Sequence, residues 1–149
     1  MGKSVFWRIS RHRDLTGAGG LRAPGRWHHA GQPIVYLAGS PAAALLEICV
    51  HTSANDIPPD FTLLKIEADG IKRDAIGPSN LPADWVPDIF ATRNIGSAWL
   101  RSGAGALLEV PSAIVPETVN YLLNPVHAEA GKFGIVDVFA WPFDIRLKT

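Results

Sequence analysis

The chain has 149 residues, and 47% of them are hydrophobic, which is enough to form the core of one ordinary domain. Its 14 Lys and Arg residues equal its 14 Asp and Glu residues, so no overall field attracts it to nucleic acid or to an anionic membrane. The single cysteine, Cys49, excludes an intramolecular disulfide and favours a reducing compartment. Because we find neither a signal pattern nor a run of about 18 apolar residues, we expect one cytoplasmic domain over residues 1–149.

The first part of the chain alternates short apolar runs with turn-forming residues. The run VFWRI at residues 5–9 predicts a strand, and the Gly-rich, charged segment 11–33 predicts a long loop. A second strand is predicted over residues 34–38. Ser40 followed by Pro41 is typical of a helix start, because the hydroxyl accepts a hydrogen bond from a free amide and Pro fits the first turn.

This helix is predicted to end at about residue 51, before two consecutive prolines. At 3.6 residues per turn, Glu47 and His51 fall on one face, beside the small side chains of Ala43 and Ala44. The carboxylate of Glu47 is therefore expected to project away from the apolar stripe of the helix. That stripe consists of Leu45, Leu46, Cys49 and Val50.

The second half of the chain mixes strand and helix signals. Residues 61–67 and 71–76 predict two strands joined by a hairpin-like turn at Ala68-Asp69-Gly70. A helix is predicted between Pro87 and Gly103. The remaining strand-forming segments are residues 106–110 and 135–143. This mixture favours an α+β fold, with a mixed β core and short peripheral helices, over a regular parallel α/β fold.

Two arginines are candidates for binding an anion. Arg26 lies in a Gly-Arg-Trp turn, where its planar guanidinium could hold a phosphate through two parallel hydrogen bonds. The alternative is a surface arginine stacked on Trp27. Arg8, in the first strand, could equally face solvent or point into a cleft.

An aromatic residue and a carboxylate follow closely. Tyr36 lies in the middle of a strand, where it could be a core residue with its hydroxyl at the surface, or a flat platform for a planar ring. Glu47 could be a solvated helix residue. Its Ala and Leu neighbours also fit a carboxylate that stabilises a developing positive charge in an apolar cleft.

Other motifs of catalytic or cofactor sites are missing from the sequence. The five histidines lack the spacing of a metal site, so we expect no bound metal. The glycines at 17–20 do not follow a βα unit as a dinucleotide fingerprint would, and no GxSxG elbow occurs. Taken alone, Ser112 and Asn124 are ordinary turn residues.

Four segments, taken in order, resemble the RES-domain family: GRWHHAGQPIVYLAGSPAAALLE, IGSAWL, LLEVPSAIVPETVNYLLNPVH and the terminal FDIR. The resemblance runs from about Phe6 to Arg146. Members of this family are toxins of bacterial toxin–antitoxin pairs. The resemblance implies a fold similar to that of ADP-ribosyltransferases, with short helices around an NAD cleft.

The resemblance also implies an activity and partners. Such a toxin degrades NAD by cleaving the nicotinamide–ribose bond, through phosphorolysis or hydrolysis, or it ADP-ribosylates a protein. NAD is then a substrate rather than a prosthetic group, and inorganic phosphate is a candidate co-substrate. The implied partner is a helix-turn-helix antitoxin that occludes the site. We expect no direct binding to nucleic acid or to a membrane. Both a monomer and a homo-oligomer are compatible with the sequence. Alternatives are a toxin acting on RNA and an interaction domain with a degenerate site.

Residue roles carry over from the resemblance position by position. The implied catalytic residues are Arg26, Tyr36, Glu47 and Ser112. The implied NAD-binding residues are Arg8, Arg26, Tyr36 and Asn124. The family usually reads GGRWN, whereas this chain has Pro24 in place of the first Gly and His28 in place of the Asn.

These roles form a coherent mechanism. Loss of nicotinamide leaves positive charge on the ribose, an oxocarbenium-like state that a carboxylate stabilises in glycosidases as well. We expect an arginine to fix the pyrophosphate, Tyr36 to hold the ring at the leaving end and Glu47 to lie beside the ribose. A phosphate acceptor would need a further basic contact, for which Arg8, Arg22, Arg93 and His28 are candidates.

Overall fold

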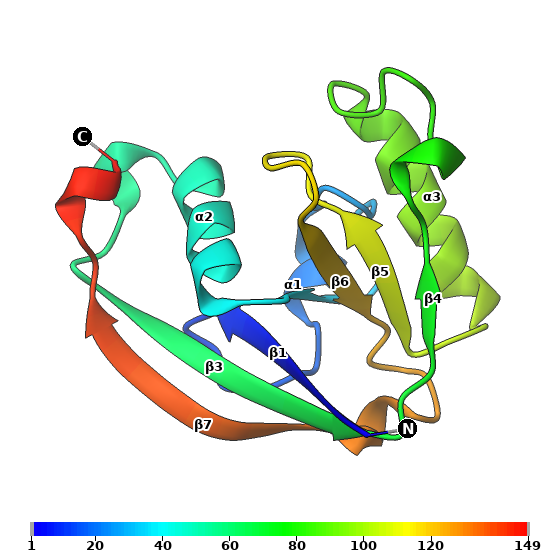
Figure 1. Cartoon of the computed structure of the whole chain (residues 1–149), viewed down its shortest axis with the longest axis horizontal. Helices are drawn as coiled ribbons and strands as arrows, with labels where there is room; N and C mark the ends of the chain where they lie inside the picture. The colour runs from blue at the N-terminus through cyan, green and yellow to red at the C-terminus, as the bar shows by residue number, and fades with distance from the viewer. Residues whose placement is uncertain (1, 149) are drawn as a thin grey trace.

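The computed structural model describes residues 2–148, in which seven strands form one mixed sheet (Figure 1). The strand order is β4-β5-β6-β2-β1-β3-β7. Of the strand pairs within residues 2–148, only β4–β5 is parallel. The strands are β1 (Lys3–Ile9), β2 (Val35–Ala38), β3 (Asp60–Asp69), β4 (Arg73–Ala75), β5 (Leu107–Pro111), β6 (Val119–Leu123) and β7 (Phe133–Pro142).

Three α-helices accompany the sheet within this part of the chain: α1 (Gly19–Arg22), α2 (Pro41–His51) and α3 (Ile89–Ser102). In Figure 1, α2 and α3 stand apart on either side of the β5–β6 region, and α1 lies behind the sheet. Single 3₁₀ turns are η1 (Ala54–Asp56), η2 (Pro78–Asn80), η3 (Ala130–Lys132) and η4 (Ile145–Leu147). The predicted α+β class is confirmed.

Side chains of the sheet form two separate cores because successive residues of a strand point to opposite faces. Val35 and Leu37 of β2 belong to one core, which also contains Phe6, Leu64, Ile66 and Phe133. Tyr36, between them, packs against the other core, where α3 contributes Leu100. This second core also contains Trp27, Ile34, Trp85, Leu108, Val110 and Leu122. The face of β2 that carries Tyr36 is therefore the face next to α3.

The predicted β1, β2 and α2 are confirmed, with bounds that differ by at most two residues. The Ser40 hydroxyl accepts a hydrogen bond from the Ala43 amide at 3.1 Å, as the cap prediction requires. The predicted apolar stripe of α2 is partly wrong. Leu46 and Val50 are 36% and 54% exposed, because α2 packs on β1 and β2 through the adjacent face of the helix. The segment predicted as one long loop also contains the short helix α1.

The hairpin predicted at residues 68–70 is wrong. Gly70 does turn the chain, with a φ of +62°, but β3 pairs with β1 on one side and with β7 on the other. No free edge of β3 is left for β4. The chain instead continues to the far end of the sheet, where β4 pairs in parallel with β5.

The prediction also missed β6, which lies between β5 and β2. Its sequence VNYLL contains an Asn and is followed by Asn-Pro, so its signal resembles that of a turn. Residues Tyr121, Leu122 and Leu123 are nevertheless buried. β6 is a central strand of the half of the sheet next to α3.

Helix α3 is confirmed at both predicted ends. The Asp88 side chain accepts the Ala91 amide at 3.1 Å, and Gly103 ends the helix in the left-handed conformation, with a φ of +62°. One face of α3 binds the backbone of the long loop. The Thr92 hydroxyl donates to the Arg26 carbonyl at 2.7 Å, and the Ser97 hydroxyl accepts the His29 amide at 2.9 Å.

Close packing of this loop against α3 requires a glycine at position 96. A Cβ at Gly96 would lie 1.7 Å from the carbonyl oxygen of Trp27. We expect Gly96→Ala to destabilise the protein by about 1–3 kcal/mol, as overpacking typically does. The matched control is Gly19→Ala, because a Cβ there meets no atom within 4 Å. Thermal denaturation should show a lower Tm for Gly96→Ala than for Gly19→Ala; equal Tm values would contradict the packing account.

No helix among residues 2–148 combines the length and the apolar character that crossing a bilayer requires.

Candidate active site

Glu47 lies on α2 and reaches across to the central strands of the sheet. The Asn120 side-chain amide of β6 donates to Glu47 Oε1 at 2.9 Å. The His51 imidazole Nε2, one turn further along α2, lies 3.3 Å from Glu47 Oε2. The Glu47 side chain is 30% exposed, so one carboxylate has both oxygens engaged by the protein while it stays open to a ligand.

The sheet register brings Tyr36 to the same face as this carboxylate. Ala38 pairs with Asn120, and Tyr36 pairs with Leu122. Because residues two apart on a strand share a face, Tyr36, Ala38, Asn120 and Leu122 line one surface. Glu47 binds the Asn120 end of that surface. The predicted convergence of Tyr36 and Glu47 on one face is thus present.

Arg26 lies in the loop before β2, with its side chain directed toward the segment before α3. Its Nη2 donates to the carbonyl oxygens of Trp85 at 2.8 Å and Val86 at 2.6 Å. The guanidinium also lies 5.6 Å from the ring centroid of Trp85. Nε is buried and has no partner within residues 2–148. These contacts fix the direction of the guanidinium, and Trp85, rather than the predicted Trp27, is the aromatic beneath it.

Three charged groups act on one another around this loop. Burial lowers the pKa of Arg26, the nearby negative charge of Glu47 opposes that change, and Arg93 of α3 reinforces it. Arg93 is held by a hydrogen bond from its Nε to the Gly25 carbonyl at 2.7 Å. Arg26 and Arg93 are therefore within electrostatic range of each other, and such a pair of positive charges suits the anionic part of a nucleotide. Arg26 is also within electrostatic range of Glu47.

Tyr36 and His28 hold the loop through a shared hydrogen bond. The Tyr36 hydroxyl accepts the Trp27 amide at 3.1 Å and lies 2.7 Å from His28 Nδ1. His28 Nε2 lies 3.2 Å from the Gly20 carbonyl, which can only accept. Nε2 therefore carries the imidazole proton, and Nδ1 accepts from the tyrosine. Burial lowers the pKa of His28 and raises that of Tyr36, so both groups are neutral at pH 7.

His28, which departs from the family pattern, is thus part of the loop's internal structure. It is 2% exposed, and its two ring nitrogens are engaged by protein atoms. Of the four groups predicted as contacts for a phosphate acceptor, His28 is the one that the structure removes from solvent.

Ser112 and Asn124 lie at the two ends of the β5–β6 pair. The buried Ser112 hydroxyl accepts the amides of Ile114 and Val115, at 3.1 and 3.2 Å, which leaves its own proton to donate. The Asn124 side chain accepts the Val126 amide at 3.2 Å and donates to the Leu100 carbonyl at 3.4 Å. Neither is hydrogen-bonded to Glu47 in the described chain, and their roles toward NAD remain predictions.

Arg8 is not brought together with the other candidates. Trp7 pairs with Ala38 and so shares the face of Tyr36, which directs the adjacent Arg8 to the opposite face of β1. There its Nη1 donates to the Asp14 carbonyl at 3.0 Å. Burial lowers the pKa of Arg8, partly offset by the charge of Asp14.

His51 is a residue of the site for which no catalytic role was predicted from the sequence. The hydrogen bond with Glu47 raises the pKa of His51 above its usual value, while partial burial acts in the opposite direction. A folded-state pKa above the unfolded one means that the pair stabilises the protein fully below the unfolded pKa, about 6.5. That stabilisation is lost as the pH rises through the folded pKa.

We therefore expect His51→Gln to lower the Tm more at a pH of about 6 than at a pH of about 9. The glutamine keeps a polar side chain but does not titrate. Because the His51 side chain is 60% exposed, the difference should amount to a few degrees at most. Thermal denaturation of both proteins at the two pH values measures it. The same Tm difference at both values would contradict the ion pair.

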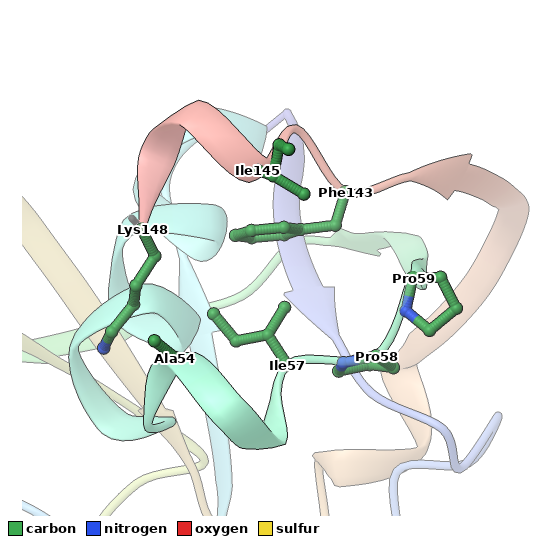
Figure 2. Close-up of a pocket in the computed structure, with 7 residues that line it drawn as sticks. All are labelled: Ala54, Ile57, Pro58, Pro59, Phe143, Ile145 and Lys148. Atoms are coloured by element: carbon green, nitrogen blue, oxygen red, sulfur yellow. The ribbon is translucent and has the colours of Figure 1, made fainter.

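Two hollows of the surface lie away from this site. One hollow, of about 90 Å³, has η1 and the segment after it on one side and the C-terminal segment on the other (Figure 2). Phe143, Ile145 and Lys148 line one side, and Ile57 lines the other. The other hollow, of about 200 Å³, is next to β4 and contains Lys72, Asp74, His127 and Glu129. Neither contains a predicted site residue.

The fold and the site define an α+β protein with a carboxylate, an aromatic and arginines around one sheet face. Its sequence matches the RES domain over residues 5–146. It is 45% identical to Toxin Res of Pseudomonas putida, over 85% of this chain and 88% of that protein. It is 38% identical to the Prs ADP-ribosylating toxin of a Sphingobium strain, over 95% of both chains. The chain belongs to the RES-domain family, as its motifs indicated.

Among solved structures, the fold is similar to a chain in the M. tuberculosis MbcT-MbcA toxin-antitoxin complex. The TM-score is 0.74 and the sequence identity 19%, over 97% of this chain and 86% of that chain. This similarity agrees with the predicted α+β fold, a mixed β core with short peripheral helices.

Proposed function

We propose that this protein is the toxin of a bacterial toxin–antitoxin pair and that it degrades NAD by cleaving the nicotinamide–ribose bond. The observation that carries the proposal is the carboxylate of Glu47, held by Asn120 on the sheet face that bears Tyr36 and within electrostatic range of Arg26. Family membership and relatives named as toxins support the biological class.

Glu47 supplies the main chemical contribution. As the glycosidic bond breaks, its electron pair leaves with nicotinamide, which departs as a neutral base, and positive charge develops on the ribose. A carboxylate next to the anomeric carbon stabilises that charge. No strong general acid is needed, because the leaving group requires no proton.

The arginines and Tyr36 serve the binding step. Arg26 and Arg93 approach each other from the loop and α3, which suits the two negative charges of a pyrophosphate. Tyr36 provides an aromatic surface beside them. Holding the pyrophosphate and the nicotinamide ring fixes the scissile bond against Glu47 and lowers the entropic part of the barrier.

Incubation of the purified protein with NAD, with and without inorganic phosphate, tests the proposal. Release of nicotinamide, with ADP-ribose phosphorylated at the anomeric carbon only when phosphate is present, identifies a phosphorylase. Free ADP-ribose in both samples identifies a hydrolase. Intact NAD in both samples would refute the proposed activity.

A second candidate is transfer of ADP-ribose to a protein. It is favoured by the relative named Prs ADP-ribosylating toxin, which is 38% identical to this chain. Both candidates break the same bond and differ in the acceptor. Labelled NAD in a bacterial lysate discriminates them, because only the transferase leaves label on a protein band.

The proposed partner is a helix-turn-helix antitoxin that covers the Glu47 face. The structural similarity to a toxin-antitoxin complex supports this part of the proposal. An antitoxin that covers this face should block NAD cleavage when it is added to the purified protein. Coexpression of the antitoxin should restore the growth of cells that make this protein. Unchanged cleavage in the complex would place the antitoxin elsewhere.

A further inference from the structure

Asn120 is a polar residue of the central strand β6. Its side-chain donor is hydrogen-bonded but, within the described chain, its side-chain acceptor is not. Its Nδ2 donates to Glu47 Oε1 at 2.9 Å. Its Oδ1 is buried and has no partner among residues 2–148. Buried side-chain acceptors are normally hydrogen-bonded, so this one calls for an explanation.

Rotating the amide by 180° would break its hydrogen bond with Glu47. Oδ1 would then face the Glu47 carboxylate, and two acceptors would meet without a proton between them. The orientation with an unsatisfied Oδ1 is therefore the one that the carboxylate requires. The unsatisfied Oδ1 is thus an unfavourable feature that accompanies the N–H donated to Glu47.

The hydrogen bond from Asn120 also limits where the carboxylate can go. His51 contacts Oε2 from the same helix as Glu47, and its side chain is 60% exposed, so this contact does not tie the carboxylate to the sheet. Asn120 is anchored by the β5–β6 and β2–β6 pairing on both sides of its strand. The contact from β6 therefore ties the orientation of Glu47 to the sheet face that carries Tyr36.

We propose that Asn120 is the positioning residue of Glu47: its side-chain amide holds the carboxylate in the orientation that faces the ribose. This inference rests on the proposed NAD cleavage. Asn120 acts through Glu47, so it contributes to the cleavage step rather than to NAD binding. The sequence alone assigned no role to Asn120.

Asn120→Ala separates positioning from a merely structural role. The substitution removes the donor to Glu47 and also removes the unsatisfied acceptor, so the two effects on stability oppose each other. We expect kcat to fall about 100-fold, the loss typical of a misplaced catalytic group, while KM stays within about twofold of wild type and the Tm is unchanged or higher. A parallel loss of Tm and activity would overturn the proposal.

Asn120→Asp gives a second test, because side-chain size alone predicts that aspartate would preserve the cleavage rate better than alanine. Aspartate matches asparagine in shape but replaces the donor with a negative charge that repels Glu47. Arg26 and His51 are charged or titratable groups that interact with Glu47, and Arg93 interacts with Arg26. We expect the rate of NAD cleavage to be highest in the wild-type protein, lower in Asn120→Ala and lowest in Asn120→Asp. A structural role predicts that aspartate is tolerated better than alanine, and that order would overturn the proposal.

Crystal structures separate a failure of this proposal from a failure of the proposed function. In Asn120→Asp, the Glu47 carboxylate should turn away from position 120, whatever the protein does to NAD. If it turns away and the wild-type protein leaves NAD intact, the proposed function fails and the positioning contact stands. If Glu47 keeps its wild-type orientation, the positioning contact fails. Asn55→Asp, an exposed residue of η1, controls for the added charge.

Discussion

We expect the Glu47→Ala protein to cleave NAD at least about 100-fold more slowly than the wild-type protein, the loss seen when a group that stabilises transition-state charge is removed. The carboxylate is hydrogen-bonded to Asn120, on the sheet face that carries Tyr36. Removing it leaves the developing charge on the ribose opposite a hydrophobic methyl group. The rate of nicotinamide release, measured at saturating NAD, gives the effect on kcat.

Glu47→Gln separates the charge of this group from its position. The amide oxygen of the glutamine can still accept from Asn120, so the geometry is kept while the negative charge is lost. Most of the activity should be lost in this variant too. Glu129→Gln removes a carboxylate from a surface pair with Lys132 and should cleave NAD at the wild-type rate. Wild-type turnover in Glu47→Ala would refute the role of the carboxylate.

Arg26→Ala should act mainly on binding. We expect KM for NAD to rise by about 10- to 100-fold, the loss of a charge-assisted contact of about 1.5–3 kcal/mol, with kcat much less affected. The Arg26 guanidinium is already oriented by the carbonyls of Trp85 and Val86. It is therefore organised before NAD arrives, and little entropy is lost when the pyrophosphate binds.

Two variants sharpen this test. Arg26→Lys keeps the charge but cannot form the same pair of carbonyl contacts together with a planar fork, so it should also raise KM. Arg101→Ala removes an exposed arginine at the end of α3 and should leave both constants unchanged. A lower kcat with an unaltered KM in Arg26→Ala would contradict a role in holding the pyrophosphate.

The helices of this fold could be predicted because their ends are encoded locally. Ser40 and Asp88 each cap the helix that follows within three residues, and Gly103 stops α3 through its own backbone conformation. The partner of β4 could not be predicted in this way. It depends on both edges of β3 being occupied by β1 and β7, and β7 lies some 60 residues further along the chain.

The candidate site was predictable to the extent that its residue types are chemically distinctive. Arg26, Tyr36 and Glu47 follow one another within 22 positions on three different elements, and the structure brings Tyr36 and Glu47 to one face. Asn120 was missed because it is 73 residues from Glu47 and lies in a strand whose short sequence resembles a turn. The opposite orientation of Arg8 required the register of β1 and β2.

A crystal structure of the Glu47→Gln protein with NAD tests the central claim most directly, since the substituted protein should bind the dinucleotide without cleaving it. The account predicts that the nicotinamide riboside end lies between position 47 and Tyr36, with the pyrophosphate against Arg26 and Arg93. A dinucleotide on the opposite face of the sheet, next to Arg8 and remote from position 47, would contradict it.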